Sequence, residues 1–212
     1  MENNKLFTKV YGWMFVGLLI SFITGYFVST KPNMVYNIAN AYWVLALVEI
    51  VVCIWLSAGI WKMQKLTAQI LYCLYSFLTG LTFSFIFVAF KLDSIIMVFG
   101  LTSLAFGLMA VVGHVTKIDL TKLGSILLMG LLAIILASII NIFVGSQTFD
   151  LGITIIGLII FILYVAYDVQ KIKRIAGTLE EDKAAILCAF ELYLDFINIF
   201  IKLLRIFGKS KD

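Results

Sequence analysis

Seven apolar stretches, each close to the length of a bilayer-spanning helix, occupy most of this chain of 212 residues. A helix needs about 20 consecutive apolar residues to cross the hydrocarbon core of a membrane. Short polar breaks separate the stretches, so sequential helices are expected to be antiparallel neighbours in one bundle. The sequence therefore predicts an all-α polytopic membrane protein with a single domain over residues 1–212. The predicted spans cover residues 11–29, 42–60, 66–90, 95–115, 123–144, 151–167 and 184–207.

The composition supports this class and excludes others. Hydrophobic residues make up 63% of the chain and charged residues 13%, which is too little charge for the surface of a soluble domain. The net charge of +4 comes from short basic loops and the termini, so it indicates membrane topology and no nucleic-acid partner. The three cysteines and the one histidine lack the spacing of a metal site, and no bound cofactor is expected.

Basic residues are distributed unevenly between the two sides of the predicted bundle. Ten Lys and Arg residues lie on the side of the N-terminus, whereas Lys31 and Lys91 are alone in the opposite connections. The positive-inside rule then places the N-terminus in the cytoplasm. The last stretch leaves two alternatives open. A full span fits its hydropathy better, and a re-entrant hairpin fits the basic tail better.

The last apolar stretch carries polar side chains at a regular spacing. Their positions return to one side of a helix, because an α-helix turns once every 3.6 residues. A charge near the middle of a bilayer costs roughly 2.5–3.5 kcal/mol, so such residues usually face protein or water. Asp195 is the centre of this predicted ion pathway, and Glu191 and Asn198 extend it. Lys202 and Arg205 would repel a cation there, so they are expected to turn toward the lipid headgroups.

Asp168, at the end of the sixth stretch, is a candidate partner of Asp195. If the sixth helix continues to Gly177, Asp168 lies roughly 14 Å before the turn, and Asp195 lies roughly 16 Å after Ala184. Antiparallel helices would place both carboxyls at a similar depth. Two carboxylates in a low-dielectric site tend to share a proton, which predicts a pH-sensitive pair and a cation site when deprotonated. The alternative is that Asp168 faces water at a cytoplasmic helix end.

Two further charged residues are candidates for a supporting role. Glu49 lies in the middle of the second stretch with no basic residue within one turn. It is therefore protonated, in a water-filled cavity, or paired with another helix. Lys62 follows at the cytoplasmic end of the same stretch, where it either reaches the headgroups or contacts Asp168 as a gate partner.

Three segments of the chain resemble the Bax inhibitor family, also called the transmembrane Bax inhibitor motif proteins. They are LYLDFINIFIKLLRIFG (192–208), YDVQKIKR (167–174) and FGLMAVVGHVTKIDLTKLGSILLMGLLAIILASIINIF (106–143), and the TKIDLTKLGS part is most similar to the bacterial branch. The resemblance implies seven helices, with the last helix central and the other six in two three-helix layers. It also implies a pH sensor at Asp168 and Asp195, and it places the family's second-helix glutamate at Glu49.

The resemblance implies a pH-sensitive calcium leak as the function. Calcium prefers six to eight oxygen ligands, so Asp168 and Asp195 would hold it only transiently, as a permeant ion. The main alternative is a non-conducting regulator that binds another membrane protein, such as a membrane protease. No enzyme activity is expected, because the bulky neighbours of Asp195 do not suit an intramembrane aspartyl protease. Proton-coupled exchange is a further alternative. The expected partners are the lipid bilayer, calcium ions, protons and a membrane protein.

Overall fold

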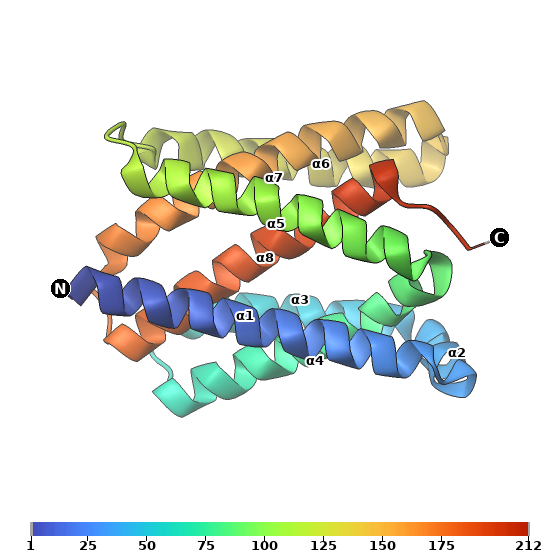
Figure 1. Ribbon diagram of the computed structural model, residues 1–212, viewed down its shortest axis with the longest axis horizontal. Coiled ribbons are helices and arrows are strands. Elements are labelled where there is room, and N and C mark those ends of the chain that lie inside the picture. Colours follow the sequence, from blue (N-terminus) through green and yellow to red (C-terminus); the bar gives the residue numbers. More distant parts are fainter. Residues whose placement is uncertain (1, 212) are drawn as a thin grey trace. The chain divides into compact units, whose positions relative to one another are not determined.

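The computed structural model describes residues 2–211 and is built from helices (Figure 1). No named strand occurs within that range, and a lone bridge joins Phe90 to Ser210. Seven of the eight helices are long and apolar enough to cross a membrane, which confirms the predicted all-α polytopic class. The helices are α1 (Glu2–Ser29), α2 (Pro32–Asn40), α3 (Tyr42–Gly59), α4 (Lys65–Ala89), α5 (Leu92–Val115), α6 (Thr121–Val144), α7 (Gln147–Ile175) and α8 (Glu181–Phe207).

The helix ends follow local sequence signals. α6 and α7 end just before Gly145 and Gly177, whose φ angles of 66° and 81° lie in the left-handed region that suits glycine. The short helix α2, which hydropathy does not predict, begins at Pro32, where the missing N–H of proline is harmless. α8 begins at Glu181 and not at the predicted Ala184. It runs unbroken to Phe207, which favours a full span over a re-entrant hairpin.

Contacts divide the chain into two compact units. Unit 1 contains α1 to α4 and the first part of α8, as far as Tyr193. Unit 2 contains α5, α6, most of α7 and the part of α8 that starts at Leu194. Each unit therefore combines three of the long helices with one part of the last helix. This grouping agrees with the two sets of three outer helices that the family resemblance implies, while their arrangement as layers stays a prediction, as does the single domain.

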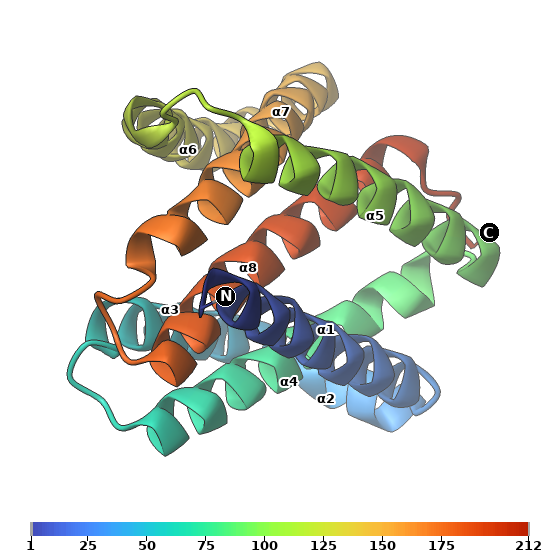
Figure 2. The same ribbon diagram turned by 60° about the vertical axis from the view of Figure 1, so that its left-hand side comes forward.

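In unit 1, α1 and α4 lie side by side (Figure 2). Small residues bring the two helices close together, as is common in membrane bundles. A Cβ atom on Gly80 of α4 would lie 2.6 Å from the Cβ of Thr24, and one on Gly25 of α1 would lie 2.9 Å from the Cβ of Phe83. Glycine is therefore needed at both positions for this helix pair to form.

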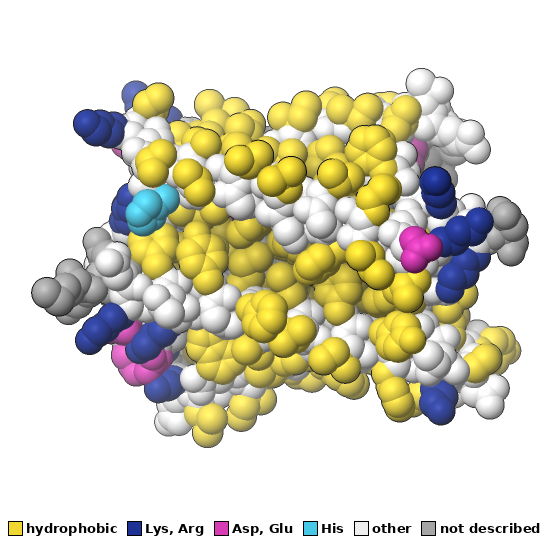
Figure 3. Space-filling view, in the orientation of Figure 1, with side chains coloured by type: hydrophobic (Ala, Val, Ile, Leu, Met, Phe, Trp, Pro, Cys, Tyr) yellow, Lys and Arg dark blue, Asp and Glu magenta, His cyan; other side chains and the backbone are white. Residues whose placement is uncertain are grey.

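Burial distinguishes α8 from the other long helices. Of its apolar stretch 78% is buried, whereas no other long helix exceeds 44%. The other helices expose apolar side chains along their middles and carry charged residues near their ends, as the visible faces of α1 and α5 show (Figure 3). That pattern is expected of helices that face lipid. α8 is thus the most buried of the long helices, and its central place among the others stays a prediction.

The segment after α8 caps the C-terminal end of α4 with hydrogen bonds. The backbone N–H of Lys211 donates to the carbonyl of Ala89 at 2.8 Å, and its ammonium donates to the carbonyl of Phe87 at 2.7 Å. These carbonyls belong to the last turn of α4, where no partner exists within the helix. The tail therefore satisfies acceptors that the helix itself leaves open.

Candidate functional site

Asp168 and Asp195 both belong to unit 2 and are both buried. Their exposed fractions are 7% and 4%, which rules out the alternative that Asp168 faces water at a helix end. Tyr164, one turn before Asp168 on α7, interacts electrostatically with both carboxyls. No role was predicted for Tyr164, because in the sequence it is one of several aromatic residues in an apolar stretch.

Close packing of α7 against α5 and α6 fixes the position of Asp168. Gly113 of α5 faces the backbone of Ala166 so closely that any Cβ would overlap it. The Gln170 side chain, beyond Asp168, accepts a hydrogen bond from Leu120 N at 2.8 Å and donates one to Ile118 O at 2.8 Å. The close contact of Gly113 with Ala166 lies before Asp168 along α7, and the two hydrogen bonds of Gln170 lie after it. Together they hold this segment of α7 against α5 and the connection that follows α5.

Aromatic contacts fix the position of Asp195. The ring of Phe196, the next residue of α8, packs against Phe99 and Phe106 of α5 at centroid distances of 5.3 and 5.7 Å. Phe200, one turn further along α8, contacts the same Phe99 at 6.4 Å. These rings pack the apolar side of α8 against α5. Uncharged residues therefore determine the orientation of α8 about its helix axis.

The polar side of α8 is less buried than its apolar sides. Glu191, Asn198 and Lys202 are half-buried and Arg205 is exposed, whereas the apolar residues between them are mostly buried. The amide of Asn198 donates to the carbonyl of Leu194 at 2.8 Å. Asp195, which lies between Glu191 and Asn198 on this side, is buried.

The basic end of this polar side is paired within unit 2. Arg205 forms an ion pair with Asp150, near the start of α7, at 3.2 Å. The expectation that Lys202 turns toward the headgroups stays a prediction. Its ammonium lies 5.8 Å from the ring centre of Phe161, the middle residue of the 29-residue helix α7. Gly157 makes room for this side chain, since a Cβ there would lie 2.5 Å from the Lys202 Nζ.

Glu49 and Lys62 both belong to unit 1. Glu49 is half-buried on α3 and accepts a long hydrogen bond of 3.5 Å from Thr82 of α4. It also interacts electrostatically with Tyr193 of α8. Lys62 is exposed in the turn after α3. Its contact with Asp168, a residue of unit 2, stays a prediction.

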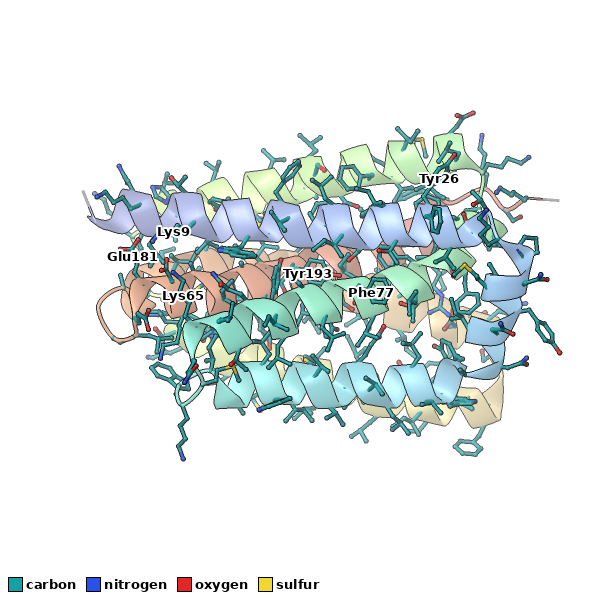
Figure 4. The ribbon with its side chains drawn as sticks, turned by 90° about the horizontal axis from the view of Figure 1, so that it is seen from below. Lys9, Tyr26, Lys65, Phe77, Glu181 and Tyr193 are labelled. Carbon is teal, nitrogen blue, oxygen red and sulfur yellow. The ribbon has the colours of Figure 1, made fainter. Side chains whose placement is uncertain are left out.

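An ionic cluster that sequence reasoning missed joins three helices of unit 1 at the start of α8 (Figure 4). The ammonium of Lys9 lies 2.6 Å from the Asp182 carboxylate and 2.7 Å from that of Glu181. Lys65 of α4 pairs with the other oxygen of Asp182. The spacing of the acidic residues at a helix start was a usable signal, because carboxylates are favourable there. Their partners, far away in the sequence, could not be predicted.

The donor atoms limit which metal the site could hold. Among the described residues, no group of three or more His, Cys, Asp or Glu side chains is arranged to bind a metal ion. Two carboxylates alone supply too few oxygens for a tightly bound calcium ion.

Comparisons with known proteins agree with the fold. The family described as the inhibitor of apoptosis-promoting Bax1 matches residues 3–212. The inner membrane protein YbhL of Escherichia coli K12 is 39% identical, with 96% of this chain and 91% of YbhL covered. A protein of Borreliella burgdorferi is 38% identical, with 99% and 94% covered, and a membrane protein of Streptococcus pyogenes serotype M6 is 32% identical, with 98% and 93% covered. With a family match over nearly its whole length and relatives of similar size, the chain belongs to the Bax inhibitor family.

Proposed function

We infer that this protein is a calcium-permeable leak of the bacterial cell membrane whose flux depends on pH. The observation that carries this proposal is the burial of Asp168 and Asp195 around Tyr164 inside a helical membrane unit. Ionisable residues are expensive within a membrane and usually mark an ion or proton pathway. Protons and cations would compete for the same two carboxyls, because protonation removes the charge that attracts the cation.

The ligand chemistry favours calcium as a permeant ion. Hard divalent cations prefer oxygen ligands, and a conducting site must bind its ion weakly enough to release it. A pair of carboxylates completed by water meets both conditions. Glu191 and Asn198 supply further oxygens on the same helix, and Glu49 supplies one in unit 1. Lys62 is the proposed gate partner of Asp168.

The proposed orientation has the N-terminus in the cytoplasm. It rests on the ten basic residues on that side of the predicted bundle. The proposed location in the cell membrane rests on the similarity to YbhL, an inner membrane protein. No enzyme activity, cofactor or nucleic-acid partner belongs to this proposal.

The test is calcium flux through the purified protein in liposomes that contain a calcium dye. Asp195→Asn and Asp168→Asn should each lower the initial rate by about ten-fold or more and flatten its pH dependence, because each removes a charge at a low-dielectric site. Asp93→Asn is the matched control, because Asp93 is exposed at the start of α5. Unchanged flux in Asp195→Asn would overturn the assigned site.

The same preparation separates the alternatives. A wild-type protein that passes no calcium would favour the non-conducting regulator of another membrane protein. Calcium movement against its own gradient, driven by an imposed proton gradient, would identify an exchanger.

A further inference from the structure

The Lys202 side chain is half-buried in unit 2. Its ammonium rests over Phe161, at the midpoint of α7, and forms no hydrogen bond or ion pair with any of the described residues. A cation near the middle of a span is unfavourable unless something compensates its charge. The face of an aromatic ring attracts a cation only modestly. Lys202 therefore lies where an additional anionic partner would stabilise it.

The nearest anion toward the membrane surface is already used. Asp150 pairs with Arg205 at 3.2 Å, and these residues lie near the start of α7 and the end of α8. Phe161 is 11 residues further along α7 than Asp150, or about 16 Å at the rise of an α-helix. The Lys202 ammonium lies beside Gly157, at a level of α7 between Asp150 and Phe161.

In the other direction, aromatic rings connect Lys202 to the acidic site. The Phe161 ring lies 6.2 Å from the ring of Tyr164, which interacts with both Asp168 and Asp195. On α8, Lys202 follows Asp195 by seven residues, which is two helical turns on the same side. One aromatic layer therefore separates the ammonium from the two carboxyls.

Gly157 provides the space in which the ammonium rests. A Cβ on this residue would lie 2.5 Å from Nζ and 2.6 Å from Cε of Lys202. Any larger residue would displace the end of the lysine side chain. The resting place is thus formed by one residue without a side chain and one aromatic ring.

We propose that Lys202 is a tethered cation that competes with permeating cations for the Asp168–Asp195 site and thereby limits calcium flux. The flexible lysine side chain carries a compact ammonium that can move between the Phe161 ring and the carboxyls. A divalent cation is repelled twice as strongly as a monovalent cation by this charge, so the lysine also sets selectivity. This inference rests on the proposed leak for its role in transport, although competition for the carboxyls can be measured without flux.

Three variants test the inference in liposomes. Lys202→Met keeps the length of the side chain and removes its charge, so it should raise the initial calcium flux by about three-fold or more. Lys202→Arg keeps the charge and should stay within about two-fold of the wild type, since the repulsion remains. Lys209→Met is the matched control, because it removes the charge of an exposed lysine in the tail. Equal effects of Lys202→Met and Lys209→Met would overturn the inference.

A binding measurement gives a second, independent result. Terbium luminescence of the protein in detergent reports a lanthanide bound at a carboxylate site, and added calcium displaces it. The calcium concentration for half displacement should fall about three-fold or more in Lys202→Met, and Asp195→Asn should abolish this shift, since both act at one site. The inference that Lys202 is a tethered cation would be overturned if Lys202→Met did not shift the calcium concentration for half displacement. It would also be overturned if this shift persisted with Asp195→Asn. Absence of flux in the wild type alone would overturn only the proposed leak.

Discussion

The hydroxyl groups of Ser21 on α1 and Tyr193 on α8 meet at 2.6 Å in the fully buried interior of unit 1. Ser21 also donates toward the carbonyl of Ser76 on α4, 2.7 Å away, so one small side chain connects three helices. Tyr193 is two residues before Asp195 on α8, and the contact therefore fixes α8 next to the candidate ion site.

Removal of the Tyr193 hydroxyl should weaken the packing of unit 1. Tyr193→Phe is expected to lower the free energy of unfolding by about 0.5–1.5 kcal/mol, the usual net contribution of one hydrogen bond. Thermal unfolding in detergent measures the change. Tyr36→Phe is the control, because Tyr36 is 68% exposed on α2. Equal stability of the two variants would show that the hydroxyl contact is not formed.

Substitution of Gly113 should disturb the attachment of α7 to α5. Gly113→Ala places a Cβ into the backbone of Ala166, and overpacking of this kind typically costs about 1–3 kcal/mol. Gly107→Ala, two turns earlier on α5, has no atom within 4 Å of the new Cβ and should be neutral or slightly stabilising. Unfolding temperatures of the two variants give the comparison, and a loss in Gly107→Ala of the same size would contradict it.

The ionic cluster at the start of α8 should make only a small, salt-sensitive contribution to stability. Asp182→Asn removes the partner of both Lys9 and Lys65, whose side chains are 41% and 46% exposed. Exposed ion pairs contribute about 0–1 kcal/mol each, and about 1 M salt reduces the range of such interactions to roughly 3 Å. The loss in Asp182→Asn should therefore shrink as salt is added. Glu180→Gln, with its single long ion pair of 3.8 Å to Lys183, serves as the control.

Single cysteines can determine the orientation in the membrane. In a background without Cys53, Cys73 and Cys188, a cysteine at Lys62 should react with a membrane-impermeant thiol reagent only from the cytoplasmic side. A cysteine at Lys91 should react only from the outside, because the positive-inside rule places the two loops on opposite sides. The reverse pattern would overturn the proposed orientation. A cysteine at Lys209 should be labelled from the outside if the last segment spans the membrane completely. It should be labelled from the cytoplasmic side if that segment is re-entrant.

Hydropathy was sufficient to predict the number and order of the membrane spans, because burial in lipid demands long apolar stretches. It was less accurate at the ends of α7 and α8. Residues 168–175 continue α7 beyond the predicted apolar span, which agrees with the helix stop considered at Gly177. α8 starts early, at Glu181, because Lys9 and Lys65 stabilise its acidic first turn.

The candidate site was predictable only in part. The burial and spacing of charges indicated Asp168 and Asp195, because ionisable residues in apolar stretches are rare. Tyr164 gave no comparable signal among the nine tyrosines of the chain. The resting place of Lys202 depends on the absence of a side chain at Gly157, a residue of another helix. Such complementarity appears only when the helices are packed.

The contact of Lys211 with the end of α4 has a consequence for the order in which this protein is completed during synthesis. Phe87 precedes Lys211 by 124 residues, so α4 reaches the membrane long before the group that satisfies its last turn exists. Four more spans must follow first. Water or headgroups must therefore serve the carbonyls of Phe87 and Ala89 in the meantime, and the exchange of these temporary partners for the tail is one of the last steps of assembly.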